Sequence, residues 1–302
     1  MTQRLLAAAV GIAALAVGGA VVSGQVFPGG VEVVEVTVSV TDADGRPVAN
    51  LMASDFEVYD DGDLQPVTHF TTERVPLSLG LLVDVSDSMR GQPIVDARQA
   101  LGHFVSTLLR EGDEAFLGTF NHQPQPITAW TKPPSGLLNA LDGRQPSGGT
   151  AIYDAIGASL DAFGRRTNSR AALVVISDGA DTASDIALRD MQERLRRTDA
   201  FLYAIAIDAE GAQRRETRVS PDALRQLTTP TGGYTQVVQS AADLPTATER
   251  LALELNSQYT LGYAAPRMPD SKWHSIRVRA TRPGLVTRSR RGYFATPPVR
   301  RR

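Results

Sequence analysis

The 302-residue chain contains no cysteine, which excludes disulfide bonds, thiolate metal ligands and attachment through a lipid-modified amino-terminal cysteine. It has four histidines, and none stands three or four residues from another, so their spacing gives no zinc motif. Aromatic residues make up only 6% of the chain and do not interleave with basic residues, which argues against nucleic-acid binding. A chain of this size must therefore rely on its core for stability, and any metal ion that it binds must have oxygen or nitrogen ligands.

Long apolar runs are also missing, except at the start of the chain. Arg4 precedes an uncharged apolar run at residues 5–22, and the small residues Ser23 and Gly24 follow it. This arrangement predicts an export signal at residues 1–25, either cleaved after Gly24 or retained as an anchor in the inner membrane. We therefore expect a bacterial protein that is periplasmic, exposed on the cell surface or secreted.

The net charge of -2 conceals an uneven distribution, because residues 271–302 carry Lys272 and nine arginines but no acidic residue. Arg277 and Arg279 alternate along one expected strand, and Arg288 and Arg290 along another, so each pair can lie on one face of a sheet. Such a stripe is either a solvated face or a contact with anionic lipid, lipopolysaccharide or an acidic partner.

The periodicity of apolar residues divides the chain into three parts. Residues 31–73 show the alternation of β-strands, and residues 258–296 return to it before a basic tail at 297–302. Between them, residues 76–255 alternate apolar strands with amphipathic helices. We predict an α/β fold, a doubly wound and mainly parallel sheet with helices on both faces. The N- and C-terminal strands are too few to form separate cores, so they are expected to pair into one small flanking β-sandwich.

The individual elements follow from the same patterns. Apolar stripes at helical spacing begin at Ile94, Ile152, Leu188 and Leu244. Strands of the parallel sheet are expected at residues 77–83, 115–120, 171–176, 201–207 and 234–238. The sandwich strands are expected at residues 31–40, 56–59, 66–70, 259–263, 275–280 and 285–289.

Polar oxygen-bearing residues follow two strands of the expected parallel sheet. Asp84, Ser86 and Ser88 come after one strand, Asp178 comes after another, and Thr150 stands between them at the start of a helix. Because the carboxyl ends of parallel strands meet at one edge, these groups should converge there. Two carboxylates with hydroxyls form a hard, all-oxygen ligand set that suits Mg²⁺, with Mn²⁺ or Ca²⁺ as alternatives.

This arrangement resembles the metal-ion-dependent adhesion site of von Willebrand factor type A domains, and the resemblance covers about residues 76–255. It implies a Rossmann-like fold in which Ser86, Ser88 and Thr150 bind the metal directly. Asp84 and Asp178 would act largely through bound water, and an Asp or Glu of a protein partner would complete the coordination. The flanks, including Gln258-Tyr259 and Arg291-Gly292-Tyr293, are similar to the bacterial VWFA-related proteins. Asp87 departs from the family pattern, which frequently has glycine there.

Weaker motifs leave alternatives. The sequences Asp42-Ala43-Asp44-Gly45 and Asp60-Asp61-Gly62-Asp63 resemble calcium loops superficially, but they lack the spaced acidic partner and are interpreted as turns.

The principal functional hypothesis is a metal-dependent protein-binding or adhesion module that is not an enzyme. An envelope scaffold that binds without metal is the alternative. A metal-dependent hydrolase is the weakest hypothesis, because only Asp87 and Asp181 stand near enough to supply a general base.

Overall fold

The protein is described by a computed structural model that covers residues 33–125, 127–132, 136–178, 180–208, 220–266 and 270–295. The expected export signal and the basic tail at 297–302 lie outside these residues. Within the described ranges, no helix is both long and apolar enough to cross a membrane.

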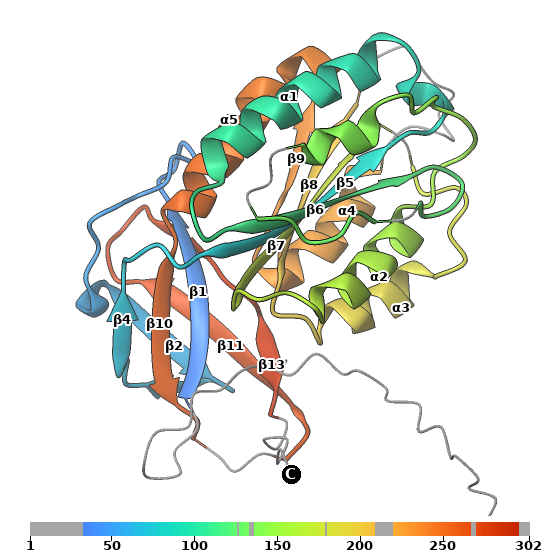
Figure 1. Ribbon diagram of the computed structural model, residues 1–302. Helices are drawn as coiled ribbons and strands as arrows, with labels where there is room; N and C mark the ends of the chain where they lie inside the picture. Colours follow the sequence, from blue (N-terminus) through green and yellow to red (C-terminus); the bar gives the residue numbers. More distant parts are fainter. Residues whose placement is uncertain are drawn as a thin grey trace, which may run out of the picture.

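Five parallel strands form the central sheet, in the order β6-β5-β7-β8-β9 (Figure 1). Every side chain of β5 and β8, and nearly every one of β7, is buried, which explains why these strands are continuous apolar runs in the sequence. The chain leaves β5 toward β6 and then returns to the other side of β5, so the strand order reverses beside β5. The strands are β5 (Leu77–Asp84), β6 (Glu114–Phe120), β7 (Arg170–Ser177), β8 (Phe201–Ile207) and β9 (Thr235–Val238).

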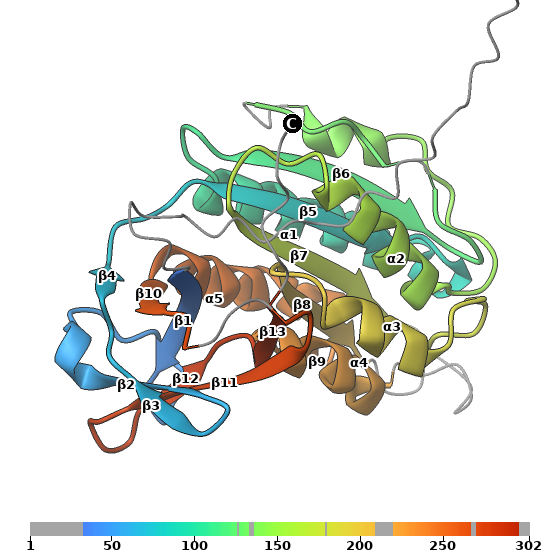
Figure 2. The ribbon, with the colours of Figure 1, turned by 90° about the horizontal axis from the view of Figure 1, so that it is seen from below.

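Helices cover both faces of this sheet, which confirms the predicted fold class (Figure 2). On one face α1 (Gln92–Leu108) and α5 (Leu244–Asn256) pack on Leu79 and Leu81. On the other face α2 (Ile152–Phe163), α3 (Leu188–Leu195) and α4 (Pro221–Thr228) pack against a second cluster. The sequence did not predict α4, which has eight residues and buries only three of them.

The flanking strands form two antiparallel sheets that share one core, as predicted. Each sheet combines strands from before and after the α/β part, in the orders β12-β1-β10-β4 and β13-β11-β2-β3. Two short strands were missed, β3 and β13, and β4 begins later than expected. The strands are β1 (Val33–Thr41), β2 (Phe56–Asp60), β3 (Asp63–Gln65), β4 (His69–Thr71), β10 (Tyr259–Ala264), β11 (Trp273–Ala280), β12 (Val286–Arg288) and β13 (Gly292–Phe294).

Both aspartate-rich sequences form turns, as expected. The side chain of Asp42 accepts hydrogen bonds from the N–H groups of Asp44 and Arg46, at 2.9 and 2.8 Å. In the second turn, Asp60 pairs with Asp63 across a tight hairpin whose central residues, Asp61 and Gly62, both have positive φ.

Candidate functional site

Asp84 and Asp178 stand at the carboxyl ends of neighbouring parallel strands. Asp84 is the last residue of β5, and Asp178 directly follows β7. The two strands are paired in register up to Val83 and Ile176, so both carboxylates emerge at the same edge of the sheet. This edge lies where the strand order reverses, which is where open α/β sheets bind their ligands.

Hydroxyl groups connect the two strand ends. The Ser88 hydroxyl donates to Asp178 Oδ1 at 2.7 Å, and the Ser86 and Ser88 hydroxyl oxygens are 3.1 Å apart. Asp84 accepts hydrogen bonds from the Ser86 N–H at 2.8 Å and from the Ser177 hydroxyl at 2.5 Å. Four of the five predicted residues therefore belong to one hydrogen-bonded cluster.

The loop that carries Thr150 is bound to both strand ends through its backbone. The Asp87 N–H donates to the Gly148 carbonyl at 3.0 Å, which joins this loop to the one after β5. The Thr182 N–H donates to the Thr150 carbonyl at 2.8 Å, and the Thr150 N–H donates to the Thr182 hydroxyl at 3.1 Å. Thr150 is itself buried, so the three loops enclose it together with the cluster.

Burial dominates the electrostatics of the two carboxylates. It raises the pKa of Asp84 to about 7, against the hydrogen bonds from Ser177 and Ser86, and the charge of Asp178 raises it further. Burial also raises the pKa of Asp178, and the hydrogen bond from Ser88 opposes this shift. Two acidic groups held close together out of water are destabilised in their charged form, so this edge of the sheet favours a cation.

The donor chemistry fits a hard divalent cation. Carboxylates and hydroxyls are the ligands that Mg²⁺, Mn²⁺ and Ca²⁺ take in proteins. The Ser86 N–H and the Ser177 hydroxyl, which donate to the buried Asp84, are both neutral. A cation would offset the mutual repulsion of Asp84 and Asp178. The residues present are therefore compatible with the ion that the sequence pattern predicts.

Three supporting residues were not predicted. The Ser177 hydroxyl holds Asp84, and the Thr182 hydroxyl holds the backbone of Thr150. Asp181 accepts hydrogen bonds from the first N–H groups of α2, those of Ile152 at 2.8 Å and Tyr153 at 3.4 Å. The pattern Ser-Asp-Gly-x-Asp-Thr, which begins at the last residue of β7, contains all three, but only tertiary contacts show what each one holds.

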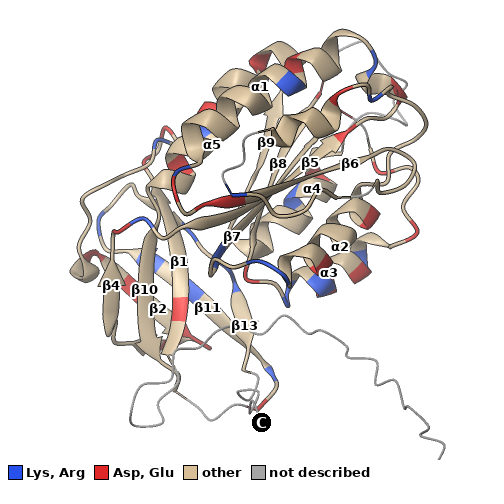
Figure 3. Cartoon of the chain, in the orientation of Figure 1, with Lys and Arg blue, Asp and Glu red and all other residues tan. Residues whose placement is uncertain are grey.

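Asp87 forms an exposed ion pair with Arg90, at 2.9 Å, in keeping with the expectation that it points away from the other loop residues. One other sequence expectation, that of two arginine stripes, changes in the structure. Figure 3 shows basic positions along β11. Of the two arginine pairs, Arg277 and Arg279 are exposed on this strand. Arg288 and Arg290 do not form a second exposed stripe, which corrects the expectation. Arg288 pairs with buried Glu254, and the buried Arg290 donates to the Glu35 carbonyl.

Comparison with known protein families identifies the α/β part. Residues 79–180 match the model of the von Willebrand factor type A domain. This stretch, about a third of the chain, is similar to that domain, and we call the α/β part, residues 77–256, the A domain. The match begins within β5 and ends just after Asp178, so this part of the A domain includes both strand ends and the Thr150 loop. No curated protein matches the chain.

Solved structures show the same fold. A von Willebrand factor type A protein from Catenulispora acidiphila matches with a TM-score of 0.52 and 11% identity, over 90% of this chain and 76% of that one. An aerotolerance-related membrane protein from Bacteroides fragilis matches with a TM-score of 0.50 and 18% identity, over 60% and 98%. Proximal thread matrix protein 1 from the mussel byssus matches with a TM-score of 0.52 and 14% identity, over 65% and 50%. At these identities the likeness concerns the fold alone.

Proposed function

We propose that this protein is an exported binding module whose A domain holds a divalent cation, with Mg²⁺ favoured, and uses it to bind a carboxylate of a protein partner. The observation that carries this proposal is the hydroxyl bridge between two buried strand-end carboxylates. The Ser88 hydroxyl oxygen lies 2.7 Å from Asp178 Oδ1 and 3.1 Å from the Ser86 hydroxyl oxygen. Binding proteins rather than enzymes commonly use such a domain, and A domains bind protein ligands.

Each residue has a distinct role in this proposal. The hydroxyls of Ser86, Ser88 and Thr150 would contact the ion, while Asp84 and Asp178 would supply the negative charge that retains it. When bound, the ion supplies a Lewis-acidic position for an Asp or Glu of the partner. The buried strands β5 and β7 fix both carboxylates before binding, so little ordering is required when the partner arrives.

The location is part of the same proposal. The apolar segment at residues 5–22 and the absence of cysteine support export to the periplasm, the cell surface or the medium. The segment is compatible with an anchor in the inner membrane as well as with a cleaved signal.

Calorimetric titration of Mg²⁺, Mn²⁺ and Ca²⁺ into the purified full-length chain tests the metal site. We expect saturable binding of one ion, lost in Asp84→Asn, which keeps the shape of the side chain but removes its charge. Asp87→Asn is the matched control, because it removes a carboxylate from the same loop that is exposed and paired with Arg90. Equal affinities in the two variants would reject the site.

A second titration tests the carboxylate. Acetate added to the Mn²⁺-loaded chain should displace bound water and lower the water proton relaxation rate, and this effect should be absent in Asp84→Asn. The competing scaffold function is favoured by the exposed Arg277 and Arg279. In that case chelator would leave binding to anionic vesicles unchanged, salt would weaken it, and Arg277→Gln with Arg279→Gln would remove it.

A further inference from the structure

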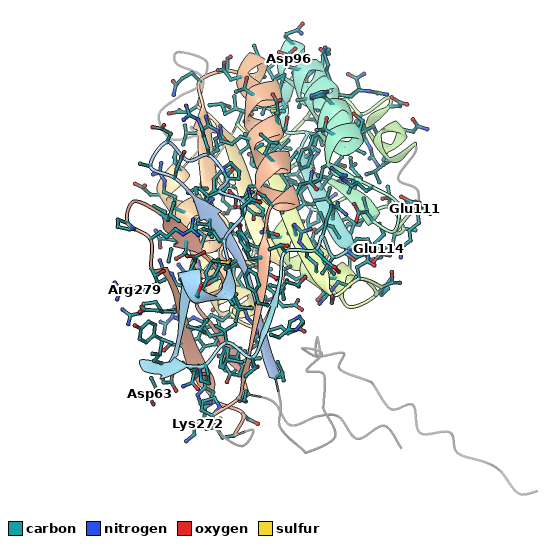
Figure 4. All side chains as sticks on the ribbon, turned by 90° about the vertical axis from the view of Figure 1, so that its left-hand side faces the viewer. Asp63, Asp96, Glu111, Glu114, Lys272 and Arg279 are labelled. Carbon is teal, nitrogen blue, oxygen red and sulfur yellow. The ribbon has the colours of Figure 1, made fainter. Side chains whose placement is uncertain are left out.

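A second group of potential ligands lies in the β-sandwich, where the β2–β3 hairpin meets β11. Among the described residues, ligand atoms of Asp60, Asp61 and His274 all lie within 4.8 Å of one another. The Asp61 N–H also donates to the Ser275 carbonyl at 2.9 Å, which fixes the hairpin against β11. Figure 4 shows Asp63 and Lys272, which flank the group in sequence, at the opposite end of the molecule from Asp96 of α1.

The imidazole of His274 is oriented by a carboxylate on each side. Nδ1 lies 2.9 Å from Asp61 Oδ2, and Nε2 lies 3.0 Å from Asp270 Oδ1. In metal sites a ligating imidazole usually donates its other N–H to a carboxylate, which fixes its tautomer and orientation. Two ligand atoms about 2.1 Å from one tetrahedral ion are about 3.4 Å apart. Nδ1 and Asp61 Oδ2, 2.9 Å apart, lie slightly closer than this value, and Asp270 stands where the orienting carboxylate would be.

Asp60 supplies an independent observation. It is completely buried, and its Oδ2 accepts hydrogen bonds from Tyr263 at 2.7 Å and Tyr293 at 3.1 Å. Its Oδ1 is also buried and has no hydrogen-bond partner among the described residues. A buried carboxylate oxygen without a partner is costly, so such an atom points to a missing ligand. Because Oδ2 is already held, Oδ1 is the oxygen of Asp60 that remains for an ion.

We propose that Asp60, Asp61 and His274 form a second metal site, which takes a divalent transition-metal ion such as Zn²⁺ through one imidazole nitrogen and two carboxylate oxygens. Asp270 is the positioning residue for His274. This mixed nitrogen and oxygen set differs from the all-oxygen set of the A domain and selects a softer ion. The ion would join the β2–β3 hairpin to β11, which are distant in sequence, and so stabilise this end of the sandwich.

Without an ion, the same arrangement has a second interpretation. A doubly protonated imidazole could donate to both Asp61 and Asp270, and it would then form an ion triad with no metal. That arrangement would satisfy His274 but would leave Oδ1 of Asp60 without a partner. The metal site accounts for both the position of His274 and the partnerless oxygen of Asp60. The two states differ in whether Zn²⁺ binds and shifts the Nδ1 resonance of His274.

The test uses the full-length chain carrying Asp84→Asn, so that the A-domain site does not contribute. Asp61→Asn removes one ligand charge but keeps Oδ1, which accepts from the Ser275 N–H at 2.8 Å. Asparagine also tolerates the φ of 49° at this position, so the variant should fold. Asp63→Asn is the control, because it removes an exposed carboxylate from the same hairpin. Zn²⁺ affinity is measured by competition with a chromophoric chelator, and thermal unfolding is followed with and without Zn²⁺.

We expect one Zn²⁺ to bind the Asp84→Asn chain and the added Asp63→Asn control equally, with a higher unfolding temperature in both. Asp61→Asn should weaken binding more than about tenfold and abolish the thermal shift. Zn²⁺ should also shift the Nδ1 resonance of His274 in a long-range ¹H–¹⁵N spectrum while Nε2 stays protonated. The absence of Zn²⁺ binding, or equal binding in Asp61→Asn and Asp63→Asn, would overturn the proposal in favour of the ion triad.

Discussion

At the scale of single residues, a charged group is buried at a position where its charge lowers the stability of the fold. Asp84 is completely buried and accepts from a serine hydroxyl and a backbone N–H. A buried carboxylate without a cation is unfavourable, because neutral donors do not replace the hydration that it loses. Such a residue is understandable if it serves binding rather than folding, since functional sites often reduce stability.

Asp84→Asn should therefore be at least as stable as the wild type when no metal is present. The amide keeps the shape of the side chain and can still accept from the Ser86 N–H, while the buried charge disappears. We expect a gain of about 1 kcal/mol in the free energy of unfolding, measured by urea denaturation in chelator at about pH 8. In excess Mg²⁺ the wild type should be the more stable of the two proteins, because the ion stabilises only the wild type. A clear loss of stability in chelator would mean that Asp84 has a structural role.

At the scale of elements, the start of α2 depends on the loop after β7. Asp181 accepts from the N–H of Ile152, and the Ser184 hydroxyl accepts from the N–H of Tyr153 and of Asp154, both at 3.1 Å. These groups satisfy donors at the first turn of the helix that no residue of the helix itself can satisfy. Because Thr150 directly precedes this turn, the cap also positions a predicted ligand.

Asp181→Ala should therefore affect both stability and metal binding. Loss of a capping carboxylate costs about 1 kcal/mol, and we expect weaker Mg²⁺ affinity because the Thr150 loop loses its support. Asp185→Ala is the control, since this neighbouring carboxylate is exposed. Denaturation and calorimetry measure the two effects. Unchanged affinity would show that the cap and the ion site are independent.

The strand β5 requires glycine at one position in its centre. A Cβ atom on Gly80 would lie 2.5 Å from Cζ of Phe116 and 2.8 Å from Cδ1 of Leu173. Gly80→Ala should lower the free energy of unfolding by about 1–3 kcal/mol through overpacking. Gly102→Ala in α1 should instead raise it by up to about 1 kcal/mol, because its nearest neighbour is a side-chain carbon at 3.4 Å. Chemical denaturation of both variants checks the opposite signs, and a stable Gly80→Ala protein would contradict the packing argument.

The elements that the sequence predicted are those with a strong apolar pattern. β5, β7 and β8 are buried on both faces, and α1 has a continuous apolar stripe. The missed elements have little such pattern. The strand β3 has no buried residue, and β13 and α4 are short. Their existence depends on neighbouring elements rather than on local preference.

The same contrast applies to the candidate sites. The convergence of the A-domain positions could be predicted, because four of them stand at or after strand ends and Thr150 precedes a helix, in a recognisable order. The group around His274 could not, because His274 and Asp61 stand 213 residues apart and meet only when β11 pairs with β2. Histidine spacing alone therefore did not indicate a transition-metal site.

At the scale of the whole molecule, the chain crosses twice between the sandwich and the A domain, and ionic groups hold this junction. Glu254 of α5 pairs with Arg288 of β12 and accepts from Tyr203 at 3.3 Å. Gln258 donates to Ser39 of β1 at 2.9 Å. A charged and hydrogen-bonded junction of this kind fixes the orientation of the two parts, so a partner bound to the A domain would be held in a defined direction relative to the sandwich.

Arg74 and Asp113 form the other half of the junction. Arg74 donates to both oxygens of Asp113, at 3.0 and 2.5 Å, and to Asn256 at the end of α5, at 2.8 Å. Burial alone would raise the pKa of Asp113, but the hydrogen bonds from Arg74 and from the N–H groups of Leu77 and Arg110 outweigh burial and lower this pKa. The folded state therefore binds the proton more weakly than the unfolded state, and the ionised carboxylate stabilises the fold.

Because folding lowers the pKa of Asp113, the stability of the protein depends on pH in the acid range. The stabilisation is complete above the unfolded pKa of about 3.9 and is lost as the pH falls through the lower folded value. Asp113→Asn should be less stable at neutral pH by about 3 kcal/mol, because the partly buried Arg74 loses its ionised partner. It should also lose less further stability than the wild type between about pH 5 and about pH 2. Urea denaturation across this range measures both effects, with exposed Asp44→Asn as the control. If acid lowers the free energy of unfolding of the wild type and of Asp113→Asn by the same amount, the ionisation of Asp113 does not contribute to acid unfolding.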